Sequence, residues 1–170
     1  RFRGSKRMIL NIYENDVLLS LYEVVKATLN YDEDLILIGR ENATQQTFTR
    51  NYIVIDTLAS VPTSRPLRKY DNVNEIEYWH TNMTGTFTLE FYGTKARVNH
   101  TNFLNLVNSQ ECRDAQKANE IVLFLPKNTN NLKMQTQSKY YERYEIEVVI
   151  QYIVKTAVDR LRIDTADIDY

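Results

Sequence analysis

The chain has 170 residues, a formal net charge of −1 and a hydrophobic content of 43%. A chain of this length buries a core of single-domain size, and a net charge near zero argues against general attraction to nucleic acid or an anionic membrane. No apolar run approaches the ~20 residues that a membrane helix requires, and the N-terminal RFRGSKRMIL lacks a secretory hydrophobic region. The composition predicts one soluble domain without a classical export signal.

Side chains that carry catalytic or metal chemistry are scarce. The single cysteine, Cys112, excludes an internal disulfide, and we expect it to be a small buried residue of a helix. His80 and His100 have no partner ligand at metal spacing, and the chain contains no phosphate loop, CxxC pair or HExxH motif. The many strand carboxylates alternate onto a solvated face. We therefore expect no enzymatic activity, no cofactor and no metal.

The first part of the chain combines one helical pattern with strand patterns. Residues 1–12 are rich in positive charge and predict a flexible arm. Asn15 or Asp16 suits the N-cap of an amphipathic helix that spans residues 17–29. Its apolar stripe is Val17, Leu18, Leu21, Val24, Val25 and Leu29. The elements expected next are a strand at 35–38, a polar loop at 42–50 and a strand at 52–58.

Residues 73–92 predict a two-stranded ribbon. We expect arms at 73–80 and 84–92, joined by a turn at Asn82-Met83-Thr84-Gly85. In the second arm, three apolar residues alternate with three polar ones, as in a half-buried antiparallel sheet. These are Phe87, Leu89 and Phe91 against Thr86, Thr88 and Glu90. Gly93 follows directly, and a strand that turns at once into a helix needs a positive φ or a close backbone approach. Gly93 is therefore predicted to be a structural requirement.

The last part of the chain predicts two helices and two or three strands. The first helix has Ala96, Phe103, Leu104, Leu106 and Val107 on one face, and Ser109 caps the second. A strand at 120–125 is expected to end at Pro126, followed by a hairpin arm or mobile loop at 127–139. Residues 140–156 predict a long strand, and 164–170 an acidic tail. One strand face is Tyr144, Ile146, Val148, Ile150, Tyr152 and Val154; the other is Arg143, Glu145, Glu147, Val149, Gln151 and Ile153.

The element order predicts an α+β fold, with one antiparallel or mixed sheet and helices on one face. We expect a single domain over residues 13–163, between the arm and the tail. Apolar or aromatic residues such as Trp79 and Ile153 occur on both predicted sheet faces, so the second face must be covered by the chain's own helices or by another subunit. This favours a subunit of an assembly; an exposed charged sheet edge is the alternative.

Two segments carry a family resemblance. FTLEFYG at 87–93, followed by Ala96, resembles the strand–Tyr-Gly–helix signature of the phage neck terminator (tail-terminator-like) proteins. YERYEIEVVIQY at 141–152 resembles their aromatic–x–Arg strand, and the earlier elements agree in order. The chain departs from the family in two places: Glu41 stands where a Gln is usual, and the prolines that normally follow the Asn are replaced by Ala43-Thr44-Gln45.

The resemblance implies a non-enzymatic virion subunit, built in the host cytoplasm, that forms a ring at the head–tail junction. Such a ring, most commonly a hexamer, caps the tail tube, docks to head-completion proteins and surrounds a DNA channel without sequence recognition. We expect Arg40, Asn42 and Arg65 to lie in docking loops, and Lys139, Tyr141 and Arg143 to clamp a neighbour. The alternatives are a tail-tube or minor capsid subunit, or a small α+β enzyme or ligand-binding domain.

Overall fold

The structure, a computed structural model, describes residues 9–10, 17–32, 35–39, 50–132, 134–136 and 139–159. Three helices and nine strands lie in this part of the chain. The helices are α1 (Val17–Leu29), α2 (Ala96–Leu106) and α3 (Gln110–Ala118). The strands are β1 (Ile9–Leu10), β2 (Ile36–Ile38), β3 (Tyr52–Pro62), β4 (Leu67–Asp71), β5 (Ile76–Tyr92), β6 (Val122–Asn131), β7 (Met134–Thr136), β8 (Lys139–Tyr141) and β9 (Arg143–Asp159).

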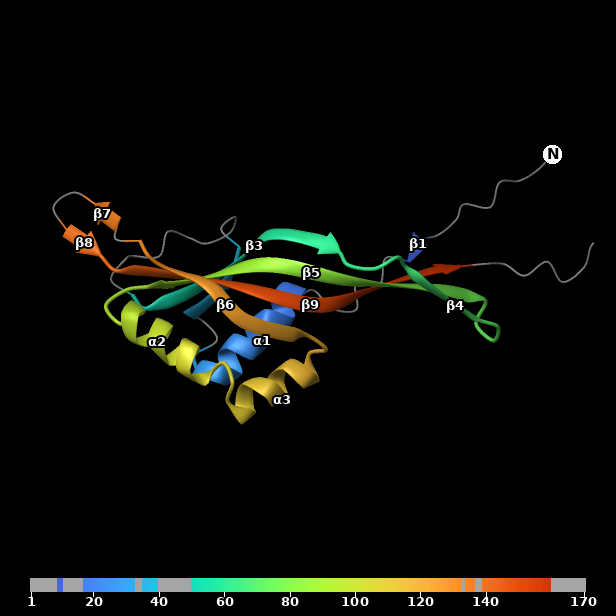
Figure 1. Cartoon of the computed structure of the whole chain (residues 1–170), viewed down its shortest axis with the longest axis horizontal. Helices are drawn as coiled ribbons and strands as arrows, with labels where there is room; N and C mark the ends of the chain where they lie inside the picture. The colour runs from blue at the N-terminus through green and yellow to red at the C-terminus, as the bar shows by residue number, and fades with distance from the viewer. Residues whose placement is uncertain are drawn as a thin grey trace, which may run out of the picture.

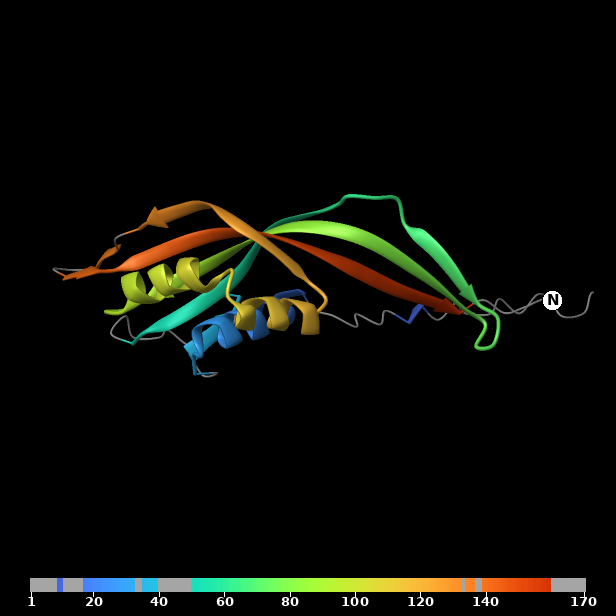
Figure 2. The ribbon, with the colours of Figure 1, turned by 60° about the horizontal axis from the view of Figure 1, so that its bottom comes forward.

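The fold is α+β, as predicted, and its main sheet is mixed. Seven strands form this sheet in the order β1-β9-β5-β3-β2, with β4 also beside β5 and β6 also beside β9. The β2–β3 pair is parallel and the other pairs are antiparallel. All three helices lie against one face of the sheet (Figures 1 and 2). We call this the inner face and its opposite the outer face.

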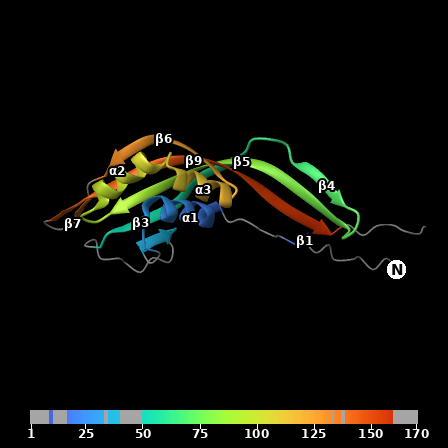
Figure 3. The same ribbon diagram turned by 90° about the horizontal axis from the view of Figure 1, so that it is seen from below.

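Two 17-residue strands, β5 and β9, run through the whole molecule. They pair without a break from Ile76 opposite Asp159 to Tyr92 opposite Arg143. The helices cover the end near Tyr92, whereas the end that carries β4 extends past them (Figure 3). Both strands are far longer than the usual 5–6 residues, and this length gives the molecule its elongated form.

The predicted turn at residues 82–85 is wrong. These residues continue β5, and Gly85 pairs with Ser60 on one side and Ile150 on the other. A Cβ atom at Gly85 would lie 2.6 Å from Phe87 Cε2, so glycine here makes room for an aromatic ring and does not reverse the chain. The actual reversal lies between β4 and β5, where Asp71 Oδ1 accepts from the backbone N–H groups of Val73 and Asn74.

The core lies between the inner face and the helices, and the predicted helix stripes face it. Phe103 and Val107 of the α2 region are buried, but Leu106 is 40% exposed, contrary to the prediction. Val107 lies one turn after Phe103 and shares its face, whereas Leu106 lies about 100° from Val107 around the helix axis, at the edge of that face. The fully buried core side chains include Leu21, Val24, Val25, Ile53, Ile55, Phe87, Leu89, Phe91, Phe103, Ile146, Val148 and Ile150.

The connection between α2 and β6 follows the sequence closely. Ser109 is the N-cap of α3, and its Oγ accepts from the backbone N–H of Cys112 at 3.2 Å. Cys112 is buried, as predicted. The prediction that Pro126 ends the strand is wrong, because β6 continues to Asn131 beyond a register shift between Phe124 and Asn128. Proline has no N–H to donate, so the ladder is interrupted there and then resumes.

The remaining strands are β1, which joins the main sheet, and the small β7–β8 sheet. Of the predicted flexible arm, Ile9 and Leu10 form β1 and pair with Val158 and Ala157. The paired strands β7 and β8 confirm the hairpin alternative for residues 127–139. The predicted cap at Asn15 or Asp16, the loop at 42–49 and the acidic tail lie outside the described residues. In the part of the chain described, no helix is long and apolar enough to cross a membrane.

Candidate interaction surface

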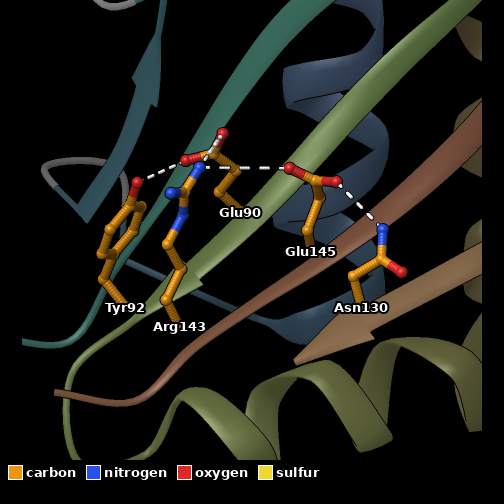
Figure 4. Close-up of polar contacts among 5 residues, drawn as sticks. All are labelled: Glu90, Tyr92, Asn130, Arg143 and Glu145. Carbon is orange, nitrogen blue, oxygen red and sulfur yellow. Dashed lines mark hydrogen bonds and ion pairs between the residues drawn. The ribbon is translucent and has the colours of Figure 1, made fainter. Parts of the chain in front are cut away.

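A buried polar network lies on the outer face, where β5 and β9 meet. The strand register places Glu90 opposite Glu145 and Tyr92 opposite Arg143. Arg143 Nη2 lies 2.8 Å from Glu90 Oε1 and 4.0 Å from Glu145 Oε2, and the Tyr92 hydroxyl donates to the Glu90 carboxylate. Figure 4 shows these side chains in one row, ending at Asn130, which donates to Glu145 at 3.3 Å.

Burial makes this network costly to break. The Glu90 side chain is 1% exposed and that of Arg143 is 18% exposed, and a buried charge is tolerated only when it is paired and hydrogen-bonded. The Arg143 guanidinium also lies 5.6 Å from the centre of the Tyr92 ring, which stacks on Tyr52 at 4.6 Å. Burial, followed by the hydrogen bond to Glu90, strongly raises the pKa of Tyr92. Tyr92 therefore remains a neutral donor to the carboxylate.

More carboxylates lie at this end of the sheet, and two of them, Glu145 and Glu147, are on the outer face. Glu147 accepts a hydrogen bond of 2.8 Å from the Asn128 amide, as Glu145 does from Asn130. Glu142 lies just before β9 and is exposed. We call Glu142, Glu145 and Glu147 the acidic stripe. Arg143 lies among them, but its nearest carboxylate is the buried Glu90.

An exposed segment at the opposite end of the sheet has more basic than acidic residues and carries exposed apolar side chains. Residues 57–70 are all exposed, although most are in strands. We call residues 57–71 the arm; it contains Arg65, Arg68 and Lys69 against one acid, Asp71. Arg68 Nε lies 3.1 Å from the buried carboxylate of Glu77. The exposed apolar side chains of the arm are Leu58, Val61, Leu67 and Tyr70.

The structure places the residues predicted for interaction at different points. Arg65 lies in the exposed arm, between β3 and β4. Lys139 and Tyr141 belong to β8, in the small hairpin sheet. Arg143 begins β9 and is held in its own chain by Glu90, while its role toward a neighbour stays a prediction. Arg40 and Asn42 lie outside the described residues.

Gly93 has a φ of 94°, the positive value that the sequence predicts for this corner. A Cβ atom there would lie 2.5 Å from the carbonyl oxygen of Arg50 and 2.7 Å from Asn51 Oδ1. That Asn51 oxygen also accepts from the backbone N–H of Lys95, just before α2. The corner therefore needs both an unusual dihedral angle and a close approach of two backbone segments.

Sequence reasoning missed the importance of Glu90 and Tyr92. Alternation assigns Glu90 correctly to the face opposite Phe91, but that face was expected to be solvated. The sequence shows a carboxylate in one long strand and an arginine in another. It does not show the register between β5 and β9, and only that register places the two side chains next to each other.

A histidine packed among aromatic rings and a hollow near the β4–β5 turn are the other candidate features of the described residues. Among them, no group of three or more His, Cys, Asp or Glu side chains could hold a metal ion. His100 packs between Phe91 and Tyr144, at ring-centre distances of 6.0 and 5.1 Å, and burial lowers its pKa. A hollow of about 570 Å³ near the β4–β5 turn is lined by residues that include Lys69, Tyr78, His80 and Lys155.

The family whose profile matches the chain is the one that the sequence resembles. The profile of the family described as phage neck terminator protein matches residues 16–170. Among solved structures, the chain is similar to the sheath/tube terminator of an extracellular contractile injection system, PVC, in the extended state. The similarity has 11% identity and a TM-score of 0.41, and covers 92% of this chain and 63% of the other. The chain thus spans less than two thirds of that protein's length. No curated protein matches the chain.

Proposed function

Because the chain belongs to the phage neck terminator protein family, we propose that it is a non-enzymatic subunit of a closed ring at the head–tail junction of a tailed phage. The ring caps the tail and docks it to the head connector around a channel for DNA. The family match over residues 16–170 carries this proposal.

The shape of the sheet supports an assembled state. In the described part of the chain, the helices cover only one end of the inner face, and the arm extends beyond them with exposed apolar side chains. Leu67 is 69% exposed and Val61 is 57% exposed, both on strands. Apolar strand surface of this kind marks a protein–protein contact or an aggregation hazard. A neighbouring subunit would remove the hazard.

The partners follow from the same proposal. The chain binds further copies of itself, most commonly as a hexamer, and the head-completion and tail-tube proteins on either side. Arg40, Asn42, Arg65, Lys139, Tyr141 and Arg143 remain the residues predicted for these contacts. A net charge of −1 suits a channel that passes DNA without holding it by its phosphates. The protein functions in the virion after assembly in the host cytoplasm, without a cofactor or a membrane.

Native mass spectrometry over a range of protein concentrations, with negative-stain images of the same samples, tests this function. A discrete multimer with a central hole is the expected result, and its mass sets the ring number. Open stacks of indefinite length would favour the tail-tube alternative. A protein that stays monomeric, and does not bind isolated tails in a pull-down, would contradict the proposal.

A further inference from the structure

We propose that the basic arm of one copy docks on the acidic stripe of a second copy. This inference rests on the proposed function in one respect, namely that copies of the chain assemble. It adds the two surfaces that meet and the charges that select them. Lys69 and Arg65 of the arm would lie against Glu142 and Glu147 of the neighbour.

The arm has the composition of a docking element. Leu67 pairs with His80 and Lys69 with Tyr78, so the apolar side chain of Leu67 and the basic side chain of Lys69 both lie on the outer face. Arg68, between them, points to the other face and is engaged by Glu77. The two positive charges of Arg65 and Lys69 thus accompany the exposed apolar side chains of the arm, and together they exceed the single negative charge of Asp71, which shares the face of Lys69.

The acidic stripe offers the complementary composition. Phe124 of β6 is 42% exposed and pairs with Val149, which lies two residues from Glu147 on the same face of β9. The stripe therefore has an apolar border beside its carboxylates, as the arm has beside its cations. An interface that joins apolar contact with opposite charges gains specificity from the charges and stability from the buried apolar area.

The charged part of the arm cannot reach the stripe of its own chain. Lys69 is opposite Tyr78 of β5, and Glu147 is opposite Thr88 of the same strand. Ten residues of extended strand separate the two positions by about 33 Å. The strand between them is hydrogen-bonded to β9 throughout, so it cannot fold back. A second molecule is therefore required to bring the two surfaces together.

A contact of this kind uses two different patches. Each copy contributes its arm to one neighbour and its stripe to the other, which is the heterologous contact that closes into a ring when the rotation between copies allows. Because the right-handed twist of long strands rotates the outer face along their length, the two ends need not point in the same direction.

Charge reversal with mixing tests the contact. The arm variant is Arg65→Glu/Lys69→Glu, and the stripe variant is Glu142→Lys/Glu147→Lys, which leaves Glu90, Arg143 and Glu145 unchanged. Each variant alone should assemble at least tenfold more weakly than the wild type in native mass spectrometry. An equimolar mixture should restore multimers in which the two variants alternate, because every arm then meets a stripe of opposite charge.

Matched controls reverse exposed charges on the helices. Lys117→Glu on α3 and Glu23→Lys on α1 change the net charge in the same two directions and should leave assembly intact. If the stripe variant unfolds at a lower temperature than the wild type, Glu147→Gln replaces it, because an amide oxygen still accepts from Asn128. Wild-type assembly of both reversed variants would overturn the contact and leave the ring function standing. Loss without rescue in the mixture would also overturn the contact.

Cross-linking decides the case in which the isolated wild type forms no ring. Ser64→Cys on the arm and Asn128→Cys beside the stripe keep all the charges that the contact uses. Oxidation of the mixed variants should give a disulfide dimer on a non-reducing gel, whereas Ser64→Cys mixed with Lys117→Cys should not. If the amount of dimer does not exceed that of the control at protein concentrations near the millimolar range, the contact is overturned, whether or not a ring forms.

Discussion

Gly93 controls the corner between β5 and α2 at the level of a single residue. Its φ of 94° is strained for any residue with a Cβ, and the space where that atom would lie is filled by the Arg50 carbonyl. We expect Gly93→Ala to lower the free energy of unfolding by about 3 kcal/mol, since the clash adds to about 1–2 kcal/mol of dihedral strain. Gly93→Val should misfold the corner.

Gly39 provides the control for this prediction. It has a φ of 69°, but among the described residues no atom beyond its chain neighbours lies within 4 Å of the position of its Cβ. Gly39→Ala should therefore show the dihedral strain alone, about 1–2 kcal/mol in urea unfolding. Equal losses for the two variants would show that the close approach to Arg50 has no energetic weight.

The ion pair of Arg143 and Glu90 is the second feature that acts at the residue scale. Arg143→Met removes a cation from a buried carboxylate, and we expect a loss of about 3 kcal/mol in chemical unfolding. The exposed pair of Lys155 and Glu120 is the control, where Lys155→Met should cost less than about 1 kcal/mol.

A double variant separates the charge from the packing. In Glu90→Gln/Arg143→Met the charge of the fully buried carboxylate is removed together with that of its partner, so much of the lost stability should return. If Arg143→Met alone leaves the unfolding midpoint unchanged, the network does not stabilise the sheet in the way its geometry indicates.

At the scale of elements, α2 is joined to the sheet partly through His100. Burial lowers the pKa of His100 from its ordinary value near 6.5, because the protonated ring is disfavoured between Phe91 and Tyr144. The unfolded chain then binds the proton at a higher pH than the folded one. This contribution to stability is present above pH 6.5 and declines as the pH falls below it.

The prediction is checked by unfolding midpoints between pH 8 and pH 5. His100→Gln should flatten the part of the decline that begins near pH 6.5, at a scale of about 1.4 kcal/mol per unit of pKa difference. His80→Gln is the control, because it leaves His100 and its aromatic neighbours in place. An identical pH profile in wild type and His100→Gln would contradict the prediction.

At the scale of the whole molecule, the arm is built for contact with something outside the chain. Its exposed apolar side chains contribute little burial to their own fold, so Val61→Thr/Leu67→Ser should change the free energy of unfolding by less than about 0.5 kcal/mol. The same change should weaken self-assembly, measured by sedimentation velocity. A stable variant that assembles like the wild type would show that the arm serves another partner or none.

Local patterns in the sequence determined most of the elements. The 3.6-residue spacing marked α1, period-two alternation marked the buried face of β5 and β9, and the conformational demand of a strand-to-helix corner marked Gly93. Each of these signals is contained within a few consecutive residues, which is why it can be recognised without a structure. The family resemblance rested on the same short segments.

Only the tertiary structure decided what depends on pairing between distant segments. Gly85 resembles a turn residue until β3 and β9 flank it, and Pro126 resembles a strand end until β6 resumes beyond its bulge. Glu90 is an ordinary strand carboxylate until the register brings Arg143 to it. In each case neighbours at least 13 residues away along the chain supply the hydrogen bonds and the burial, and no local pattern contains them.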